Sequence, residues 1–353
     1  MKARDASVAR PPLRTLFGAA LCALGLAVGA TALAQEDASK GSFRDRMRQR
    51  LIERQQAQPA PQGDTDAKAP LTKPGDYTVT IEQGGLKRAY KVHVPVTYRP
   101  ATPAPLLVAM HGGGGSMDLQ ASDAHYGLIS KSDREGFVVV FPNGFSQLAS
   151  GKFATWNAGN CCAAARDRNA DDVGFIRQMV ENLFLQLNID RQKVFATGMS
   201  NGGLMAHRLA CEASDLFKAI APVAGTDNTK TCTPTNPVSV LLIHARDDDH
   251  VLFNGGAGKP LKASTVTDFT SVPETVSRWV GRNGCTGAPQ RVLEVPGAYC
   301  DRYVACQGGA RVELCVTETG GHSWPGGTKA RGNKAGSTAI SADDVMWDFF
   351  MGR

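Results

Sequence analysis

The sequence lacks a strong excess of charge of either sign. Its 353 residues carry 39 basic and 33 acidic side chains, a formal net charge of +6. Residues 1–34 contain four of the basic groups and one of the acids, so 35 basic and 32 acidic side chains remain. From residue 76 onward the counts are 27 and 26, and this part is nearly neutral. A nucleic-acid-binding protein needs a basic stripe or patch, so the sequence excludes nucleic acid as a partner.

The sequence also lacks internal repeats and any second change of composition after residue 76. Residues 76–353 have the length of a single catalytic domain. Residues 35–75 are basic at first and then rich in Gln and Pro, a composition that cannot bury a core. We predict a disordered tether there. Contact with a membrane surface or an anionic polymer is the alternative for its Arg-rich part.

Residues 1–34 have the pattern of an export signal. A basic leader precedes an apolar stretch of small residues, 16–34, that ends in Ala-Leu-Ala. This arrangement is typical of a signal peptide with its cleavage site. A membrane anchor is the competing interpretation, but the cleavage motif favours removal near Ala34 and a mature chain that begins at Gln35. We therefore expect a secreted protein, extracellular or periplasmic, without a stable membrane anchor.

Hydrophobic patterns after residue 76 predict alternating strands and helices. The segments 77–81 and 90–94 alternate around a Gly-Gly pair and predict a β-hairpin. Continuous apolar runs, such as 106–110 and 137–141, are typical of parallel strands that are buried on both faces. Further strands are expected at 194–197, 219–223 and 238–244 and around residues 292, 303 and 312, and helices at 122–135, 173–187, 201–214, 273–283 and 341–351. This order predicts an α/β domain with a mostly parallel central sheet, an antiparallel N-terminal hairpin and helices on both faces.

A Gly-x-Ser-x-Gly pattern lies between one of these strands and the following helix. It reads Gly198-Met199-Ser200-Asn201-Gly202. A strand–turn–helix context is that of a nucleophile elbow, whose sharp turn exposes the serine oxygen. The amide of Asn201 begins the helix and can stabilise an oxyanion. The alternative is a glycine-rich turn that merely contains serine, so the partners decide.

The loop that follows the strand at 106–110 is rich in glycine. It reads His111-Gly112-Gly113-Gly114-Gly115-Ser116. Glycine lets a backbone N–H approach a ligand closely, and this loop supplies the second oxyanion donor in such enzymes. A phosphate-binding loop is the rival interpretation, but no Lys-Ser/Thr pair follows the glycines. We therefore predict Gly113 and Asn201 as the two oxyanion donors.

A serine nucleophile needs a base and an orienting acid, in the chain order serine, acid, histidine. His322 lies in a glycine-flanked loop between the last strand and the last helix, where the base is expected. Asp247–Asp249 follow the strand at 238–244 and offer the acid, although the pattern alone does not decide among the three. With His250 they could instead form a metal site. Consecutive side chains rarely converge on one point, so we expect no metal and no cofactor.

Eight cysteines remain after residue 34, an even number that fits export. The segments 299–304 and 311–316 alternate around a Gly-Gly turn and predict an antiparallel hairpin. Pairing Tyr303 with Val312 sets Cys300 opposite Cys315, at a separation of ~5.5 Å that a disulfide can span. We predict the bridges Cys300–Cys315, Cys285–Cys306 and Cys211–Cys232, and leave open whether Cys161 and Cys162 form a vicinal bridge or two thiols.

These motifs, together with residues 156–162 and 171–175, resemble the secreted polyhydroxybutyrate depolymerase and feruloyl esterase family. The resemblance covers roughly residues 76–353 and implies an α/β-hydrolase fold and a carboxylic ester hydrolase. It aligns residues 244–248 with a turn that reads His-Gly-Thr-x-Asp in the family, which assigns the acid to Asp248. It also implies that Trp156 and Trp324 border the acyl pocket, and Trp324 follows His322 by two residues.

The main functional prediction is a secreted serine esterase of the polyhydroxybutyrate depolymerase type that uses Ser200, His322 and Asp248. The alternative is a feruloyl or acetylxylan esterase that acts on plant polysaccharide esters. A remote alternative is a non-catalytic polysaccharide-binding protein, but the joint presence of nucleophile, acid, base and oxyanion glycines favours catalysis. The expected partner is a small-molecule or oligomeric ester substrate.

Overall fold

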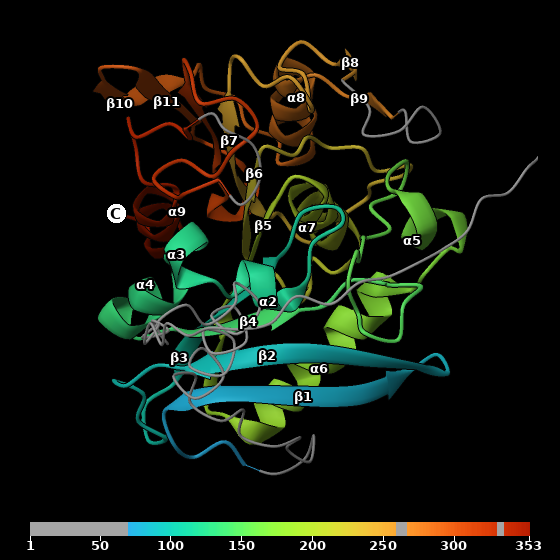
Figure 1. Cartoon of the computed structure of the whole chain (residues 1–353). Helices are drawn as coiled ribbons and strands as arrows, with labels where there is room; N and C mark the ends of the chain where they lie inside the picture. The colour runs from blue at the N-terminus through green and yellow to red at the C-terminus, as the bar shows by residue number, and fades with distance from the viewer. Residues whose placement is uncertain (1–69, 259–266, 330–334) are drawn as a thin grey trace, which may run out of the picture. The chain divides into compact units, whose positions relative to one another are not determined.

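The computed structural model describes residues 70–258, 267–329 and 335–353 (Figure 1). The expected signal peptide, residues 1–34, and all but the end of the expected tether lie outside these residues. Within the described ranges, no helix combines the length and the apolar character that a membrane span requires.

One large sheet organises the described residues. Its ten strands have the order β1-β2-β4-β3-β5-β6-β7-β12-β11-β10 (Figure 1). Their bounds are β1 Gly75–Gln83, β2 Leu86–Val94, β3 Ala104–Met110, β4 Val138–Pro142, β5 Ile189–Met199, β6 Ala219–Val223, β7 Ser239–Ala245, β10 Gln290–Val295, β11 Ala298–Tyr303 and β12 Val312–Thr317. Neighbouring strands from β4 through β12 are parallel. The hairpin β1–β2 at one edge and the strands β11 and β10 at the other are antiparallel, so the sheet has the predicted architecture.

Helices cover both faces of this sheet, as expected (Figure 1). They are α2 Met117–Gln120, α3 Asp123–Tyr126, α4 Leu128–Glu135, α5 Ala163–Asp167, α6 Asp172–Gln186, α7 Asn201–Glu212, α8 Val272–Arg282 and α9 Ala342–Met351. A separate two-stranded sheet pairs β8 Gly256–Ala257 with β9 Asp268–Phe269. The sequence patterns predicted neither this small sheet nor the short helices α2 and α5, because segments of two to five residues carry too little periodicity.

The core is divided by the sheet into two layers, because successive strand residues point to opposite faces. Leu106 and Val108 of β3 contact the layer under α6, α7 and α8, whereas Leu107 and Ala109 contact the layer under α4 and α9. Every residue of β4 and β6 is buried, which explains why these strands read as continuous apolar runs.

One expected helix is broken in the structure. The segment 122–135 forms α3 and α4 in place of a single helix, and Gly127 between them has a φ of +67°. A Cβ added at Gly127 would lie 2.7 Å from Oδ2 of Asp343, the second residue of α9. The prediction of one continuous helix was therefore wrong, because packing against the C-terminal helix sets the break.

The C-terminal hairpin has the predicted register. Tyr303 pairs with Val312, and Cys300 lies opposite Cys315. The structure forms the bridges Cys300–Cys315, Cys285–Cys306 and Cys211–Cys232, and it also joins Cys161 to Cys162 as a vicinal bridge. Of the two alternatives left open for Cys161 and Cys162, the structure therefore shows the vicinal bridge.

Candidate active site

Ser200 occupies a sharp turn between β5 and α7. Its φ of +55° and ψ of −119° lie in a region that L-residues rarely adopt. The turn requires glycine on both sides, because a Cβ at Gly198 would lie 2.5 Å from the carbonyl carbon of Gly202. A Cβ at Gly202 would overlap the carbonyl oxygen of Met110 at the end of β3. This is the backbone geometry of a nucleophile elbow, and it was predicted from the spacing of the glycines.

Asp248 follows β7 and is buried, with 4 % of its surface exposed. Its Oδ1 accepts the backbone amides of His250 (2.8 Å) and Val251 (2.9 Å). Its Oδ2 accepts Nδ1 of His322 at 2.8 Å, and Nε2 of the buried His244 lies 3.5 Å away. Burial favours the neutral acid, but the hydrogen bond from His322, the nearby imidazoles and the amide of His250 outweigh it and lower the pKa of Asp248. The carboxylate is therefore ionised and held in a fixed orientation.

His322 lies in the loop that follows β12, and its side chain is 16 % exposed. Because an ionised carboxylate only accepts hydrogen bonds, Nδ1 of His322 donates to Asp248, and Nε2 is the nitrogen that is left to face a reactant. The preceding residue, Gly321, donates its amide to Oδ1 of Asp247 at 2.7 Å. The loop is thus fixed at two consecutive residues by two consecutive aspartates, of which Asp248 holds the imidazole.

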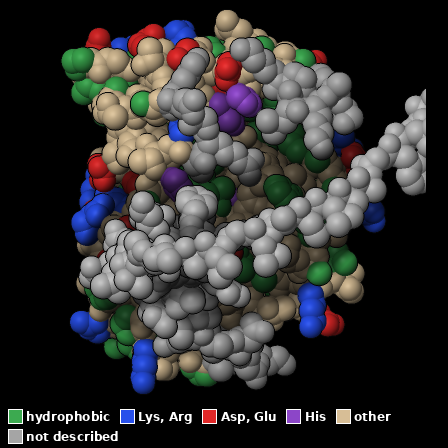
Figure 2. Space-filling view, viewed as in Figure 1, with side chains coloured by type: hydrophobic (Ala, Val, Ile, Leu, Met, Phe, Trp, Pro, Cys, Tyr) green, Lys and Arg blue, Asp and Glu red, His purple; other side chains and the backbone are tan. Residues whose placement is uncertain are grey.

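The strand order brings Ser200, Asp248 and His322 to the carboxyl-terminal end of the parallel strands. The parallel strands β5, β6, β7 and β12 are neighbours, so the loops that follow them leave the sheet on the same side. On the face shown in Figure 2, histidine side chains reach the surface beside acidic side chains. Among the described residues, no hydrogen bond joins Ser200 to His322. Such contacts are often long in enzymes without substrate and tighten in the complex.

Two backbone amides beside Ser200 are available to an incoming oxyanion. A Cβ at Gly112 would lie 3.5 Å from Cβ of Ser200, and one at Gly113 would lie 3.6 Å from Cβ of Asn201. The glycine loop and the start of α7 are therefore in contact. Within the described part of the chain, the amides of Gly113 and Asn201 donate to no backbone or side-chain acceptor. Free amides next to the nucleophile have the arrangement of an oxyanion hole.

A buried network beneath these amides was not predicted. The side chain of Asn201 accepts the amide of Trp156 at 2.7 Å and donates to the carbonyl of Trp156 at 3.1 Å. The indole N–H of Trp156 donates to the carbonyl of His111 at 2.9 Å. His111 in turn donates from Nδ1 to the carbonyl of Gly112 and accepts the amide of Gly144 at Nε2 (3.0 Å). Complete burial lowers the pKa of His111 to about 4, so the ring is neutral, as an Nε2 acceptor must be. In the sequence, the glycines next to His111 and Asn201 were the signal that could have indicated this network.

The expectation that Trp156 and Trp324 border the acyl pocket stays a prediction. Trp156 is fully buried and donates its indole N–H to the carbonyl of His111, the first residue of the oxyanion loop (residues 111–116). Trp324 is 4 % exposed, lies edge-on to Tyr126 with ring centroids 5.4 Å apart, and donates its indole N–H to Asp343 at 3.0 Å. Each buried indole N–H is paired with an acceptor from another segment of the chain.

Asp248, Asp249 and His250 offer ligand atoms within 4.8 Å of one another. Asp248 already accepts two amides and an imidazole, which fits an orienting acid better than a metal ligand.

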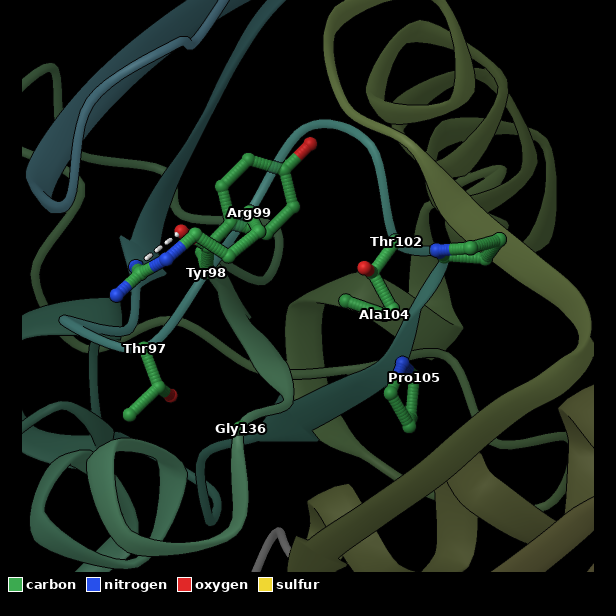
Figure 3. A pocket seen from close by; sticks show the side chains of 8 residues that line it. Thr97, Tyr98, Arg99, Thr102, Ala104, Pro105 and Gly136 are labelled. Carbon is green, nitrogen blue, oxygen red and sulfur yellow. Dashed lines mark hydrogen bonds between the residues drawn. The ribbon is translucent and has the colours of Figure 1, made fainter.

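A separate pocket, drawn in Figure 3, lies where β3 begins and is lined by Tyr98, Thr102 and Gly136 among others. Arg99 donates to the carbonyl of Tyr98 there at 2.8 Å. This pocket lies at the opposite end of the parallel strands from Ser200.

Comparison with known proteins decides the family. The chain is 31 % identical over 301 residues to NocK from Nocardia uniformis subsp. tsuyamanensis, a protein with an attributed esterase role, and the match covers 78 % of this chain and 84 % of NocK. The chain belongs to the α/β-hydrolase serine esterases. The family model of the prolyl oligopeptidase family also matches residues 134–236 of this esterase, which include Ser200.

Feruloyl esterases are among the similar proteins. Feruloyl esterase B from Piromyces equi is 32 % identical over 226 residues, which cover 62 % of this chain but only 40 % of that longer protein. Feruloyl esterase D from Neurospora crassa is 27 % identical over 267 residues, covering 72 % of this chain and 80 % of that one. The solved structure of an acetyl xylan esterase from Aspergillus awamori shares the fold, with a TM-score of 0.51 and 16 % identity over 75 % of this chain and 94 % of that chain.

Proposed function

We propose that this esterase is exported and hydrolyses feruloyl or acetyl esters of plant polysaccharide, with Ser200 as nucleophile, His322 as base and Asp248 as orienting acid. The observation that carries the mechanism is the 2.8 Å bond from His322 Nδ1 to the buried Asp248, at the sheet edge where Ser200 occupies a strained turn. Four bridges among the described cysteines support export, because disulfides persist in oxidising compartments.

The reaction has two acyl-transfer steps. Ser200 Oγ attacks the ester carbonyl while Nε2 of His322 takes its proton, and the amides of Gly113 and Asn201 stabilise the oxyanion. The imidazolium is stabilised by Asp248 and gives its proton to the departing alcohol, which leaves an acyl ester on Ser200. A water molecule, deprotonated by His322, then attacks that ester, and His322 returns the proton to Ser200 Oγ as the acid is released.

The substrate class is supported by the relatives and by one exposed aromatic side chain. Two of the similar sequences named above are feruloyl esterases, which favours polysaccharide esters over the polyhydroxybutyrate type. Phe153 is 69 % exposed and has a φ of +55°. Its neighbour Ala154 pairs with Gly115 of the oxyanion loop, and the carbonyl of Ala154 accepts the amide of Gly114 at 2.8 Å. An exposed ring held beside the oxyanion loop is suited to contact an aromatic acyl group.

The test is a panel of purified esters: methyl ferulate, acetylated xylan, hydroxybutyrate oligomers and p-nitrophenyl acetate. We expect turnover of methyl ferulate or acetylated xylan at a higher kcat/KM than of the oligomers. Ser200→Ala should lower kcat by at least ~10³-fold without unfolding, whereas Ser277→Ala, at an exposed position of α8, should leave kcat unchanged.

Two results would refute the proposal in different ways. Preference for hydroxybutyrate oligomers would return the substrate class to the depolymerase type. Binding of polysaccharide without hydrolysis of any ester would instead identify a non-catalytic binding protein.

A further inference from the structure

A second histidine lies against the imidazole of His322. The rings of His250 and His322 are stacked, with centroids 4.9 Å apart and an angle of 17° between their planes. The His250 side chain is 42 % exposed, whereas that of His322 is 16 % exposed. One face of the proposed base is therefore covered by another imidazole, and the mechanism above leaves that imidazole without a role.

His250 is itself fixed in position. Its Nδ1 lies 2.7 Å from Oδ1 of Asp249, and its backbone amide donates to Oδ1 of Asp248 at 2.8 Å. The same residue thus contacts the orienting acid through its backbone and the base through its ring. The turn that follows β7 thus supplies both the orienting acid and the ring that covers the base.

His322 needs such a second contact. The bond from Nδ1 to Asp248 fixes one atom of the ring but still permits the ring to rotate about that bond, which would turn Nε2 away from Ser200. A flat surface stacked on the ring restricts this rotation. Proton transfer from Ser200 depends on that orientation, since a displacement of about 1 Å can reduce the rate about 10²-fold.

We propose that His250 is a positioning residue that holds the plane of the His322 imidazole through ring stacking. This inference rests on the proposed function, in which His322 is the base. The role belongs to the ring face, so another flat ring can replace it.

The kinetic test compares three substitutions at one position, with p-nitrophenyl acetate as substrate. His250→Ala removes the ring, His250→Leu keeps apolar volume without a flat face, and His250→Phe keeps a flat face without a titratable nitrogen. We expect kcat to fall about tenfold for Ala and Leu, with KM within twofold of wild type. Phe should recover most of kcat.

Three kinetic results would overturn the proposal: an unchanged kcat in His250→Ala, a Phe variant as impaired as the Ala variant, or a Leu variant that recovers kcat as well as Phe does. Circular dichroism and thermal unfolding identify any variant that fails to fold. The Leu and Phe variants keep the position filled, so the comparison between them survives a misfolded Ala variant.

Proton NMR tests the stack without turnover. In the Ser200→Ala background, ring protons of His322 should be shifted by the ring current of His250, with the assignment taken from His322→Asn. The shift should disappear in His250→Ala and persist in His250→Phe, and its absence from the parent protein would refute the stack. If the wild type hydrolyses no ester, the proposed function fails, while this measurement still decides whether the rings are stacked.

Discussion

The two halves of the candidate site are built in opposite ways. The oxyanion half rests on His111, Trp156 and Asn201, which are at most 3 % exposed and carry no charge. The acid–base half consists of Asp247–His250 and His322, a cluster of ionisable groups of which Asp249 and His250 are more than 40 % exposed. The difference shows that oxyanion stabilisation and proton transfer need different kinds of residue. Amide donors must be held rigidly, whereas a base must exchange protons.

The same contrast determines how each half responds to change. In the oxyanion half, a buried polar atom that loses its partner cannot turn to water, so the cost is structural. In the acid–base half, a lost partner can be replaced by solvent unless it is the buried Asp248. Substitutions should therefore separate kcat from stability in the acid–base half and couple them in the oxyanion half.

The largest expected effect lies within the aspartate triplet. Asp248→Asn should lower kcat by about 10³–10⁴-fold, because the amide supports the wrong tautomer of His322 and leaves its imidazolium without a countercharge. The loss of stability should be small despite burial, because the oxygen of the equally sized Asn side chain can still accept the backbone amides of His250 and Val251. Asp247→Asn is the matched control. Its remaining side-chain oxygen can still accept the amide of Gly321, so kcat should fall less than about threefold.

Steady-state kinetics and thermal unfolding of both variants provide the measurement. A crippled Asp247→Asn with a nearly normal Asp248→Asn would show that the acid has been assigned one residue too late in the turn.

In the oxyanion half, the indole N–H of Trp156 should affect both stability and kcat. Trp156→Phe removes the indole N–H that binds the carbonyl of His111, and an unpaired buried acceptor costs about 1–3 kcal/mol. Because this carbonyl begins the glycine loop, kcat should also fall about tenfold. Trp279→Phe is the matched control, since its buried indole N–H donates to Nδ1 of His207 at 2.9 Å, in the core layer that contains α7 and α8.

Both variants should lose similar free energy of unfolding in urea, but only Trp156→Phe should lose kcat. Equal losses of kcat in the two variants would mean that general destabilisation, and not the oxyanion loop, is being measured.

Much of the fold was predictable because its signals are local. Buried runs such as 106–110 and alternating segments such as 299–304 define strands by themselves, and the Gly-Gly turn at 308–309 fixed the register of the hairpin. The break at Gly127 was not predictable. It depends on Asp343, which is distant in the sequence and meets this glycine only after α9 has packed.

The candidate site likewise contains residues that local sequence signals mark and residues that depend on distant partners. Ser200 and His322 are marked by glycines whose spacing the turn geometry demands, and the resemblance selected Asp248 from its neighbours. The hydrogen bonds of the Trp156 and Trp324 indoles were not predicted, because their acceptors, on His111 and Asp343, lie elsewhere in the sequence. No local pattern reveals such an acceptor.

The buried His111 should make the stability of the protein depend on pH. Burial lowers the pKa of His111 from 6.5 to about 4. Between these values the unfolded chain binds a proton that the folded protein does not, so stability falls as the pH is lowered from about 6.5 to about 4. One pKa unit corresponds to about 1.4 kcal/mol, which makes the full loss about 3 kcal/mol.

His111→Gln tests this assignment. Glutamine can both accept from Gly144 and donate to Gly112, but it does not titrate. Urea unfolding at pH 7.5 and pH 5 should show a weaker pH dependence in the variant than in the wild type. An unchanged difference between the two pH values would mean that His111 is not a source of the acid sensitivity.

The smallest effect should distinguish substrates and leave the catalytic chemistry intact. Phe153→Ala should raise KM for methyl ferulate about fivefold, equivalent to about 1 kcal/mol of lost ring contact. KM for p-nitrophenyl acetate, whose acetyl group has only a methyl beside the carbonyl, should stay within twofold. Leu185→Ala is the control, because Leu185 is a 74 % exposed apolar side chain on α6. A parallel rise in KM for both esters would show that Phe153 acts on the oxyanion loop through Ala154, and would place it with the rigid half of the site instead of the substrate contact.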